Sequence, residues 1–181
     1  LHLPVQSGCD EILRRMNRRY TTAEYRTHVE KLRAVLPEVS LTTDLIVGFP
    51  GETDAMFEET LHFIDEMKFD AAFTFLYSKR SGTPAATLEP QVAQSVKQAR
   101  LQQLMSRQNA ISLQANERWL DRTVEVLADG PSKTDPAVYS GRTVQNKLVL
   151  WPTEPDDRPG VFRQVRLTSA QTFLLKGIAV S

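Results

Sequence analysis

The 181-residue chain carries 22 Lys and Arg residues against 22 Asp and Glu residues, so its formal net charge is zero, and 41% of its residues are hydrophobic. This composition is typical of a globular protein and excludes a collagen-like, low-complexity or disordered chain. The single cysteine, Cys9, excludes an internal disulfide, and with His2, His28 and His62 it shows no metal-ligand spacing. We therefore expect no zinc or iron–sulfur site built from this chain alone, and we assign Cys9 no catalytic role.

The charge balance and the apolar runs limit where the protein can act. Proteins that hold nucleic acids mainly by bulk charge have a basic surplus, so any nucleic-acid binding by this neutral chain must come from a local patch or from residues outside the chain. The longest apolar runs, 45–49 and 71–77, fall far short of the ~20 residues that span a bilayer. We expect no membrane segment and a reducing, cytoplasmic setting. The chain opens on a strand-like segment, Leu1–Val5, without an initiator Met, which predicts that it begins inside a domain, as a fragment.

Strand and helix patterns alternate over the first 77 residues. Tyr25, Val29 and Leu32 recur at helical spacing, and Thr21 with Glu24 has the form of a capping box. The predicted elements are a strand at Leu1–Val5, helices at Asp10–Arg19 and Ala23–Leu36, a strand at Leu41–Val47, a helix at Asp54–Lys68 and a strand at Ala71–Tyr77. This order indicates three parallel βα units with right-handed crossovers. Three strands do not close a βα barrel, so we expect the amino-terminal half of the sheet to be missing.

The pattern changes in the second part of the chain. A loop at Ser78–Glu89 precedes Pro90, which is predicted to open a long polar helix over about residues 91–118. The clearest strand patterns that follow are Thr123–Leu127, Asn146–Trp151, Val161–Leu167 and Phe173–Val180. Four or five short strands in about 60 residues favour a small barrel of OB-like type. The predicted fold class is therefore α/β followed by all-β.

Polar, glycine-bearing segments follow each of the three strands in the first part. Gln6–Gly8 can either line a ligand or form a tight capped turn. Gly48–Gly51 matches neither a GxGxxG motif nor a P-loop, and by itself indicates a rigid turn with Thr53 capping the next helix. Lys79–Arg80 can contact an anion or simply face solvent. Because the carboxyl ends of parallel strands meet at one edge, the three segments together predict a ligand-binding face.

Basic and amide groups gather near turns in the second part. They lie in Gly130–Lys133 and Gly141–Lys147, with Tyr139 and Trp151 close in sequence. OB-like barrels bind single strands by aromatic stacking beside basic grooves. Trp151 can equally belong to the barrel core, with the basic residues in solvent. The residues alone leave both interpretations open.

Four motifs follow one another along the first part of the chain: His2–Gly8, Met16–Arg18, Thr43–Thr53 and Phe75–Ala86. Together they resemble the radical S-adenosylmethionine methylthiotransferases, and residues from Trp119 to Val180 resemble that family's RNA-binding TRAM domain. The resemblance covers essentially the whole chain. It implies the carboxyl-terminal half of a radical S-adenosylmethionine partial TIM barrel at 1–118, with a linking helix at about 91–118, and a TRAM domain at 119–181.

Within the family, the resemblance is strongest to the tRNA branch. It rests on Gly130–Lys133, Gly141–Thr143, Asn146–Lys147 and Ala72–Phe75. It implies transfer of a methylthio group to C2 of an N6-isopentenyladenosine next to the anticodon. Relatives that act on threonylcarbamoyl-adenosine in tRNA, or on an aspartate of a ribosomal protein, are alternatives. An alternative of another class is an RNA-binding module without catalysis, which is how the chain by itself is expected to behave.

The resemblance also implies which residues form the sites. Those that would contact S-adenosylmethionine are Gln6, Ser7, Gly8, Arg18, Ile46, Gly48, Tyr77 and Arg80. Arg18 would meet the carboxylate of the cofactor. Ile46 and Gly48 would flank its adenine, and Tyr77 and Arg80 would close the site. Those that would contact tRNA are Lys133, Arg142 and Lys147.

The family's chemistry needs two four-iron four-sulfur clusters. One cleaves S-adenosylmethionine reductively to a 5′-deoxyadenosyl radical, and sulfur arrives from the second. The C-x3-C-x2-C set and the three further cysteines that hold them are absent from this sequence, so no catalytic or metal-binding residue is assigned to it. The implied partners are the tRNA anticodon stem-loop and an electron donor such as flavodoxin or ferredoxin, with the protein a monomer. Two departures are Cys9, where Ser is common, and Ser81, where Pro often follows the arginine.

Overall fold

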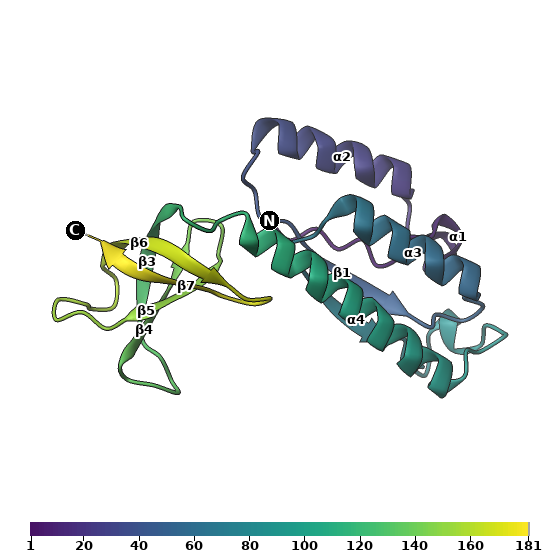
Figure 1. Ribbon diagram of the computed structural model, residues 1–181. Helices are drawn as coiled ribbons and strands as arrows, with labels where there is room; N and C mark the ends of the chain where they lie inside the picture. The colour runs from purple at the N-terminus through teal and green to yellow at the C-terminus, as the bar shows by residue number, and fades with distance from the viewer. Residues whose placement is uncertain (181) are drawn as a thin grey trace. The chain divides into compact units, whose positions relative to one another are not determined.

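The computed structural model describes residues 1–180 and shows two compact units. The first is Leu1–Ile111, and the second begins at Ser112. The boundary falls within a long helix, drawn in green in Figure 1. Among the described residues, no helix is both long enough and apolar enough to cross a membrane.

Helices and strands alternate in the first unit, as the sequence pattern predicts. Its elements are α1 (Asp10–Arg15), α2 (Thr22–Val35), β1 (Thr42–Val47), α3 (Asp54–Met67), β2 (Ala71–Leu76), a short 3-10 helix (Pro84–Ala86) and the start of α4 (Gln94–Glu117). Two boundaries differ from the prediction. Helix α1 ends at Arg15 because Asn17 has a left-handed backbone, with φ of 57°. Helix α4 begins at Gln94 and not directly after Pro90, whose carbonyl oxygen instead accepts a hydrogen bond from the N–H of Gly51 at 2.8 Å.

The sheet of the first unit is parallel. Strands β1 and β2 pair along their full length. The segment Leu1–Gln6 lies beside β1 and makes two isolated parallel bridges, from His2 to Thr42 and from Gln6 to Leu45. Three residues, Leu3–Val5, therefore oppose two, Thr43 and Asp44, between the bridges, so the predicted first strand is present in an irregular form. Gln6, which follows the predicted strand directly, has a left-handed backbone with φ of 71°.

One face of this sheet is buried and the other is open. Leu45 and Val47 of β1 pack into a core with side chains from the helices, which include Tyr25 and Val29 of α2, Phe57, Phe63 and Ile64 of α3, and Leu104 of α4. On the opposite face, Phe73 and Phe75 of β2 are 60% and 50% exposed. The helices α2, α3 and α4 thus share one core with a single face of the sheet (Figure 1).

The second unit is a closed barrel. Its strands are β3 (Thr123–Pro131), β4 (Val138–Thr143), β5 (Leu148–Pro152), β6 (Phe162–Ala170) and β7 (Leu175–Val180), in the order β3-β4-β5-β7-β6. All neighbours are antiparallel except β5 and β7, which are parallel. The predicted change from α/β to all-β is therefore confirmed.

Strand β4 is the strand that the sequence pattern did not single out. It contains Gly141, a residue type that is depleted in strands. The barrel needs the glycine, because a Cβ at Gly141 would lie 2.4 Å from the carbonyl oxygen of Leu127 on the neighbouring strand. The close approach of β3 and β4 therefore requires glycine at this position, and glycine weakens the strand pattern in the sequence.

The aromatic residues of the barrel lie in its core. Trp151 and Tyr139 are both buried, and their ring centroids are 5.6 Å apart. The indole N–H of Trp151 donates to Asp157 at 3.0 Å. The interpretation in which these two rings stack on a nucleic acid is therefore wrong, because neither ring presents a face to solvent.

Candidate functional site

The carboxyl ends of the three parallel segments meet at one edge of the sheet. The N–H of Ile46 donates to the carbonyl oxygen of Gln6 at 2.9 Å, and the N–H of Tyr77 donates to that of Val47 at 2.9 Å. The backbone thus brings Gln6, Ile46 and Tyr77 together, as the parallel topology predicts. Ile46 is half-buried and belongs to the open face of β1, whereas Leu45 and Val47 face the core.

Ser7 and Gly8 lie against helix α3. The hydroxyl oxygen of Ser7 is 3.4 Å from that of Thr60, which also accepts the N–H of Gly8 at 3.1 Å. A Cβ at Gly8 would lie 2.5 Å from the Cβ of Phe63, so only glycine allows this approach. In the structure, both residues therefore help to pack the end of the first strand against α3.

The turn after β1 is held by its own chain. Gly48 and Gly51 have left-handed backbones, with φ of 73° and 78°. The N–H of Gly48 donates to Oε2 of Glu52 at 2.8 Å, and that of Gly51 donates to the carbonyl of Pro90. Thr53 caps α3 by accepting the N–H of Met56 at 3.3 Å. Because these two glycine amides already have acceptors, the turn is a rigid connection and not an open anion cradle.

A buried ion pair lies behind this turn, and sequence reasoning missed it. Arg100 of α4 donates to Oε2 of Glu52 at 2.8 Å and to Oδ1 of Asp54 at 2.7 Å. The side chains of Arg100 and Glu52 are 7% and 1% exposed. Burial raises the pKa of Glu52, against the opposing effects of the Gly48 N–H and the arginine. No local pattern marks Arg100, because it lies in a polar helix 48 residues beyond its partner.

The other residues predicted to meet the cofactor differ in their surroundings. Tyr77 packs edge-on against Phe49, with ring centroids 5.1 Å apart, and its hydroxyl is buried with no hydrogen-bond partner among residues 1–180. Its carbonyl oxygen accepts the ammonium of Lys97 at 3.2 Å. Arg80 is exposed on the loop that follows β2.

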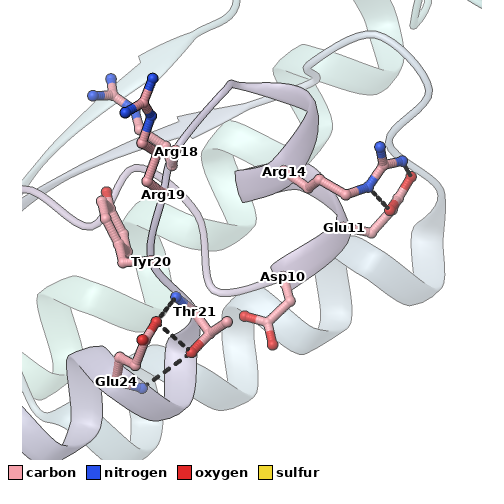
Figure 2. Close-up of a pocket in the computed structure, with 8 residues that line it drawn as sticks. All are labelled: Asp10, Glu11, Arg14, Arg18, Arg19, Tyr20, Thr21 and Glu24. Carbon is pink, nitrogen blue, oxygen red and sulfur yellow. Dashed lines mark hydrogen bonds and ion pairs between the residues drawn. The ribbon is translucent and has the colours of Figure 1, made fainter.

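Arg18 lies in a pocket of about 350 Å³ near the start of α2. The pocket is lined by Asp10, Glu11, Arg14, Arg18, Arg19, Tyr20, Thr21 and Glu24, all drawn in Figure 2. Its carboxylates already accept hydrogen bonds. Glu11 accepts from Arg14 and Arg15, which lower its pKa to about 2, and Glu24 belongs to the capping box with Thr21. Figure 2 shows the exposed side chains of Arg18 and Arg19 extending together, away from the capping box.

The three residues predicted to contact RNA differ in their exposure to solvent and in their hydrogen-bond partners. Lys133 is exposed in the connection between β3 and β4. Arg142 is exposed on β4, where it donates to the carbonyl of Asn146 at 3.2 Å. Lys147 is half-buried, and its ammonium donates to Oδ1 of Asn116 at 2.9 Å. Lys147 is therefore already engaged within its own unit.

The described residues do not fit an iron–sulfur cluster. Within residues 1–180, His, Cys, Asp and Glu side chains form no group of three or more that could hold a metal ion. Cys9 is the single cysteine of the chain and is buried. Burial is the main cause that raises the pKa of its thiol to about 11, so it is protonated at neutral pH and is a poor metal ligand.

Comparison with known proteins finds a family-model match within the first unit. Residues 1–64 match the family model described as the Radical SAM superfamily. This match spans the first strand end, α1, α2, β1 and most of α3, and it includes the candidate residues up to Gly48.

Curated relatives extend the similarity to nearly the whole chain. The chain is 53% identical over 177 residues to the tRNA-2-methylthio-N(6)-dimethylallyladenosine synthase of Moorella thermoacetica, a match that covers 98% of the chain and 40% of that protein. It is 47% identical over 180 residues to the synthase of the same name from Carboxydothermus hydrogenoformans, with 99% and 41% covered. For that of Clostridioides difficile the identity is 42% over 181 residues, with 100% and 38% covered.

These matches confirm the resemblance to the radical S-adenosylmethionine methylthiotransferases that the motifs predict. The chain is homologous to these synthases over nearly all of its length. It spans about two fifths of the length of the relatives it matches.

Proposed function

We propose that the protein belongs to a tRNA methylthiotransferase that adds a methylthio group to C2 of N6-isopentenyladenosine beside the anticodon. The observation that carries the proposal is the 53% identity to a tRNA-2-methylthio-N(6)-dimethylallyladenosine synthase over 98% of this chain. In this proposal, residues 1–118 form the carboxyl-terminal half of a partial TIM barrel, and residues 119–181 form a TRAM domain that contacts the anticodon stem-loop.

The strand ends of the first unit fit S-adenosylmethionine in part. Three of the candidate residues, Ser7, Gly8 and Gly48, are hydrogen-bonded to other parts of the chain. Their role would be to support the backbone of the site and not to contact the cofactor through free polar groups. Ile46 and the half-buried ring of Tyr77 are available to pack against an adenine, and the exposed guanidinium of Arg18 is available to a carboxylate. Bound S-adenosylmethionine supplies a hydrogen-abstracting radical in this superfamily.

The chain's own residues would bind and orient the cofactor. Gln6 is 9% exposed and is paired through its backbone to Ile46, and its side-chain amide would be the group it offers to the cofactor. Arg80, on the loop after β2, would close over the site and exclude water. The described residues do not fit the two clusters, so we assign them no step of sulfur transfer or electron delivery.

The barrel supports the RNA-binding part of the proposal. Its closed strand order, with β5 parallel to β7, supports an OB-like barrel, and such barrels bind oligonucleotides on the face of their second and third strands and on adjoining loops. Those strands are β4 and β5, and the loops include the β3–β4 connection. Arg142 and Lys133 lie on these parts, so they are the residues we expect to meet tRNA phosphates.

The proposal is tested by mass spectrometry of tRNA nucleosides from cells that lack the gene. We expect 2-methylthio-N6-isopentenyladenosine to disappear and N6-isopentenyladenosine to accumulate. Complementation with the complete gene should restore the methylthio form. Retention of the methylthio form would contradict the proposal, and loss of methylthio from threonylcarbamoyl-adenosine instead would assign the substrate of the alternative branch.

A further inference from the structure

We propose that Arg100 and Lys97 are positioning residues for the cofactor site. From one face of α4 they hold the turn after β1 and the end of β2 in a fixed conformation. This inference rests on the proposed binding of S-adenosylmethionine at these strand ends. Both residues lie outside residues 1–64, the segment that matches the superfamily model, so the site would extend beyond that segment.

Arg100 acts on the turn through Glu52. One of its terminal nitrogens donates to both the carbonyl oxygen and Oε2 of Glu52, at 3.1 and 2.8 Å. The same Oε2 accepts the N–H of Gly48 at 2.8 Å. The guanidinium therefore fixes the main chain and the side chain of Glu52, and through them the left-handed backbone of Gly48 directly after β1.

Lys97 reaches both strand ends at once. It lies three residues before Arg100, on the same side of the helix. Its ammonium donates to the carbonyl oxygen of Tyr77 at 3.2 Å and lies 5.0 Å from the centroid of the tyrosine ring. Its aliphatic stem occupies the space beside Gly48, where a Cβ would lie 2.4 Å from Cγ of Lys97. Lys97 of α4 therefore contacts the carboxyl ends of both β1 and β2.

The need for stability does not account for this arrangement. The free energy that two charges lose when they leave water is about as large as the free energy gained from their attraction. Replacing a buried ion pair by apolar residues of similar volume therefore often leaves the stability of a protein unchanged. The arrangement also leaves Nε of Arg100 buried with no hydrogen-bond partner among residues 1–180. What the pair supplies, and an apolar pair would not, is a directed hydrogen bond to one backbone amide.

The test replaces Arg100 in the complete 181-residue chain and measures two properties of the site. Isothermal titration gives the dissociation constant for S-adenosylmethionine, and hydrogen exchange gives the protection of the Gly48 amide. We expect Arg100→Met to weaken binding about tenfold and to accelerate Gly48 exchange at least about tenfold, the effect of losing a charge-assisted hydrogen bond. Arg100→Lys should recover part of both, because it restores the charge.

Two controls separate positioning from general destabilisation. Leu104→Ala removes a buried core contact one turn further along α4 and should lower the melting temperature without changing either measurement in the folded protein. Asp54→Asn weakens only the exposed partner of Arg100 and should have little effect. The inference is overturned if Arg100→Met leaves both measurements within twofold of the unaltered chain, or if Leu104→Ala changes them equally.

A third outcome concerns the proposed function. If the unaltered chain binds no S-adenosylmethionine, the cofactor assignment for this chain fails, and positioning for that cofactor fails with it. Exchange at Gly48 is measured without any ligand, so it still shows whether Arg100 holds the turn. The two failures are therefore distinguishable.

Discussion

At the scale of single residues, Cys9 shows how burial changes chemistry. It precedes α1 and packs in a small cluster with Ile12 and Phe49. Burial is the main cause that raises the pKa of its thiol to about 11, and Glu59 contributes further. Because the folded-state pKa lies above the usual value of 9.0, the thiol's contribution to stability is complete below that pH and is lost as the pH rises towards 11.

The first prediction follows from this thiol. At pH 8 we expect iodoacetamide to label Cys9 in the folded chain on the order of 100-fold more slowly than in urea, because the reactive thiolate is both scarce and buried. The labelling rate of the folded chain should rise with pH up to about 11. Mass spectrometry of timed samples provides the measurement, and Cys9→Ala shows the unlabelled background. Equal rates with and without urea would show that the thiol is open to solvent.

At the scale of elements, one carboxylate organises the connection between β5 and β6. The side chain of Asp157 is 0% exposed. It accepts hydrogen bonds from the indole of Trp151 at 3.0 Å, from the N–H of Glu154 at 2.8 Å and from Arg163 at 2.7 Å. Asp156 binds the same arginine at 2.6 Å but is 69% exposed. Asp156 and Asp157 therefore bind the same arginine but differ in burial, so they can be compared directly.

The second prediction compares these neighbours. Asp157→Ala should lower the free energy of unfolding by about 2–4 kcal/mol, because it leaves three donors unpaired, of which the indole N–H is in the core. Asp156→Ala should cause a much smaller loss, because water replaces an exposed partner. Urea unfolding followed by tryptophan fluorescence measures both. Equal losses would show that the attraction to Arg163, and not the buried network, stabilises this connection.

Local signals predicted the elements best. Thr21 and Glu24 form the expected capping box, with the N–H of Glu24 donating to the Thr21 hydroxyl and the N–H of Thr21 donating to the Glu24 carboxylate. Both partners lie within one turn of the helix, so the sequence contains the whole interaction. The same holds for Thr53 at the start of α3.

Contacts between residues that are far apart along the chain could not be predicted from the sequence. For Gly8 the sequence alone leaves a ligand contact and a turn both open, and it does not show the neighbour, Phe63, which is 55 positions further along the chain. Arg100 was unmarked for the same reason, because Glu52 becomes its neighbour only when α4 packs on the sheet. The sequence alone does not decide whether Trp151 lies in the core or on the surface, since a period-2 pattern does not say which face of a strand closes into a barrel.

At the scale of the whole molecule, the neutral charge limits how RNA can be held. Because 22 basic residues balance 22 acidic ones, bulk attraction to phosphates contributes little. Binding must depend on particular basic side chains that are free to release counterions. Lys133 is exposed, and Arg142 is exposed in a solvent-accessible pair with Asp129 at 3.8 Å. The ammonium of Lys147, by contrast, is half-buried, donates to Asn116 and lies 6.0 Å from the centroid of the Trp119 ring.

The last prediction uses this difference. Lys133→Ala and Arg142→Ala should each weaken binding of an anticodon stem-loop RNA and reduce the slope of log K against log salt by ~0.7–0.9, the value for one phosphate contact. Lys147→Ala should reduce the slope less, because its half-buried ammonium is held by Asn116 beside the ring of Trp119 and is less accessible to a phosphate. Lys31→Ala, at an exposed position on α2, removes the same charge outside the barrel and serves as the control. Fluorescence anisotropy over a salt series measures each slope, and equal reductions in all four variants would show that total charge, not a patch on the barrel, holds the RNA.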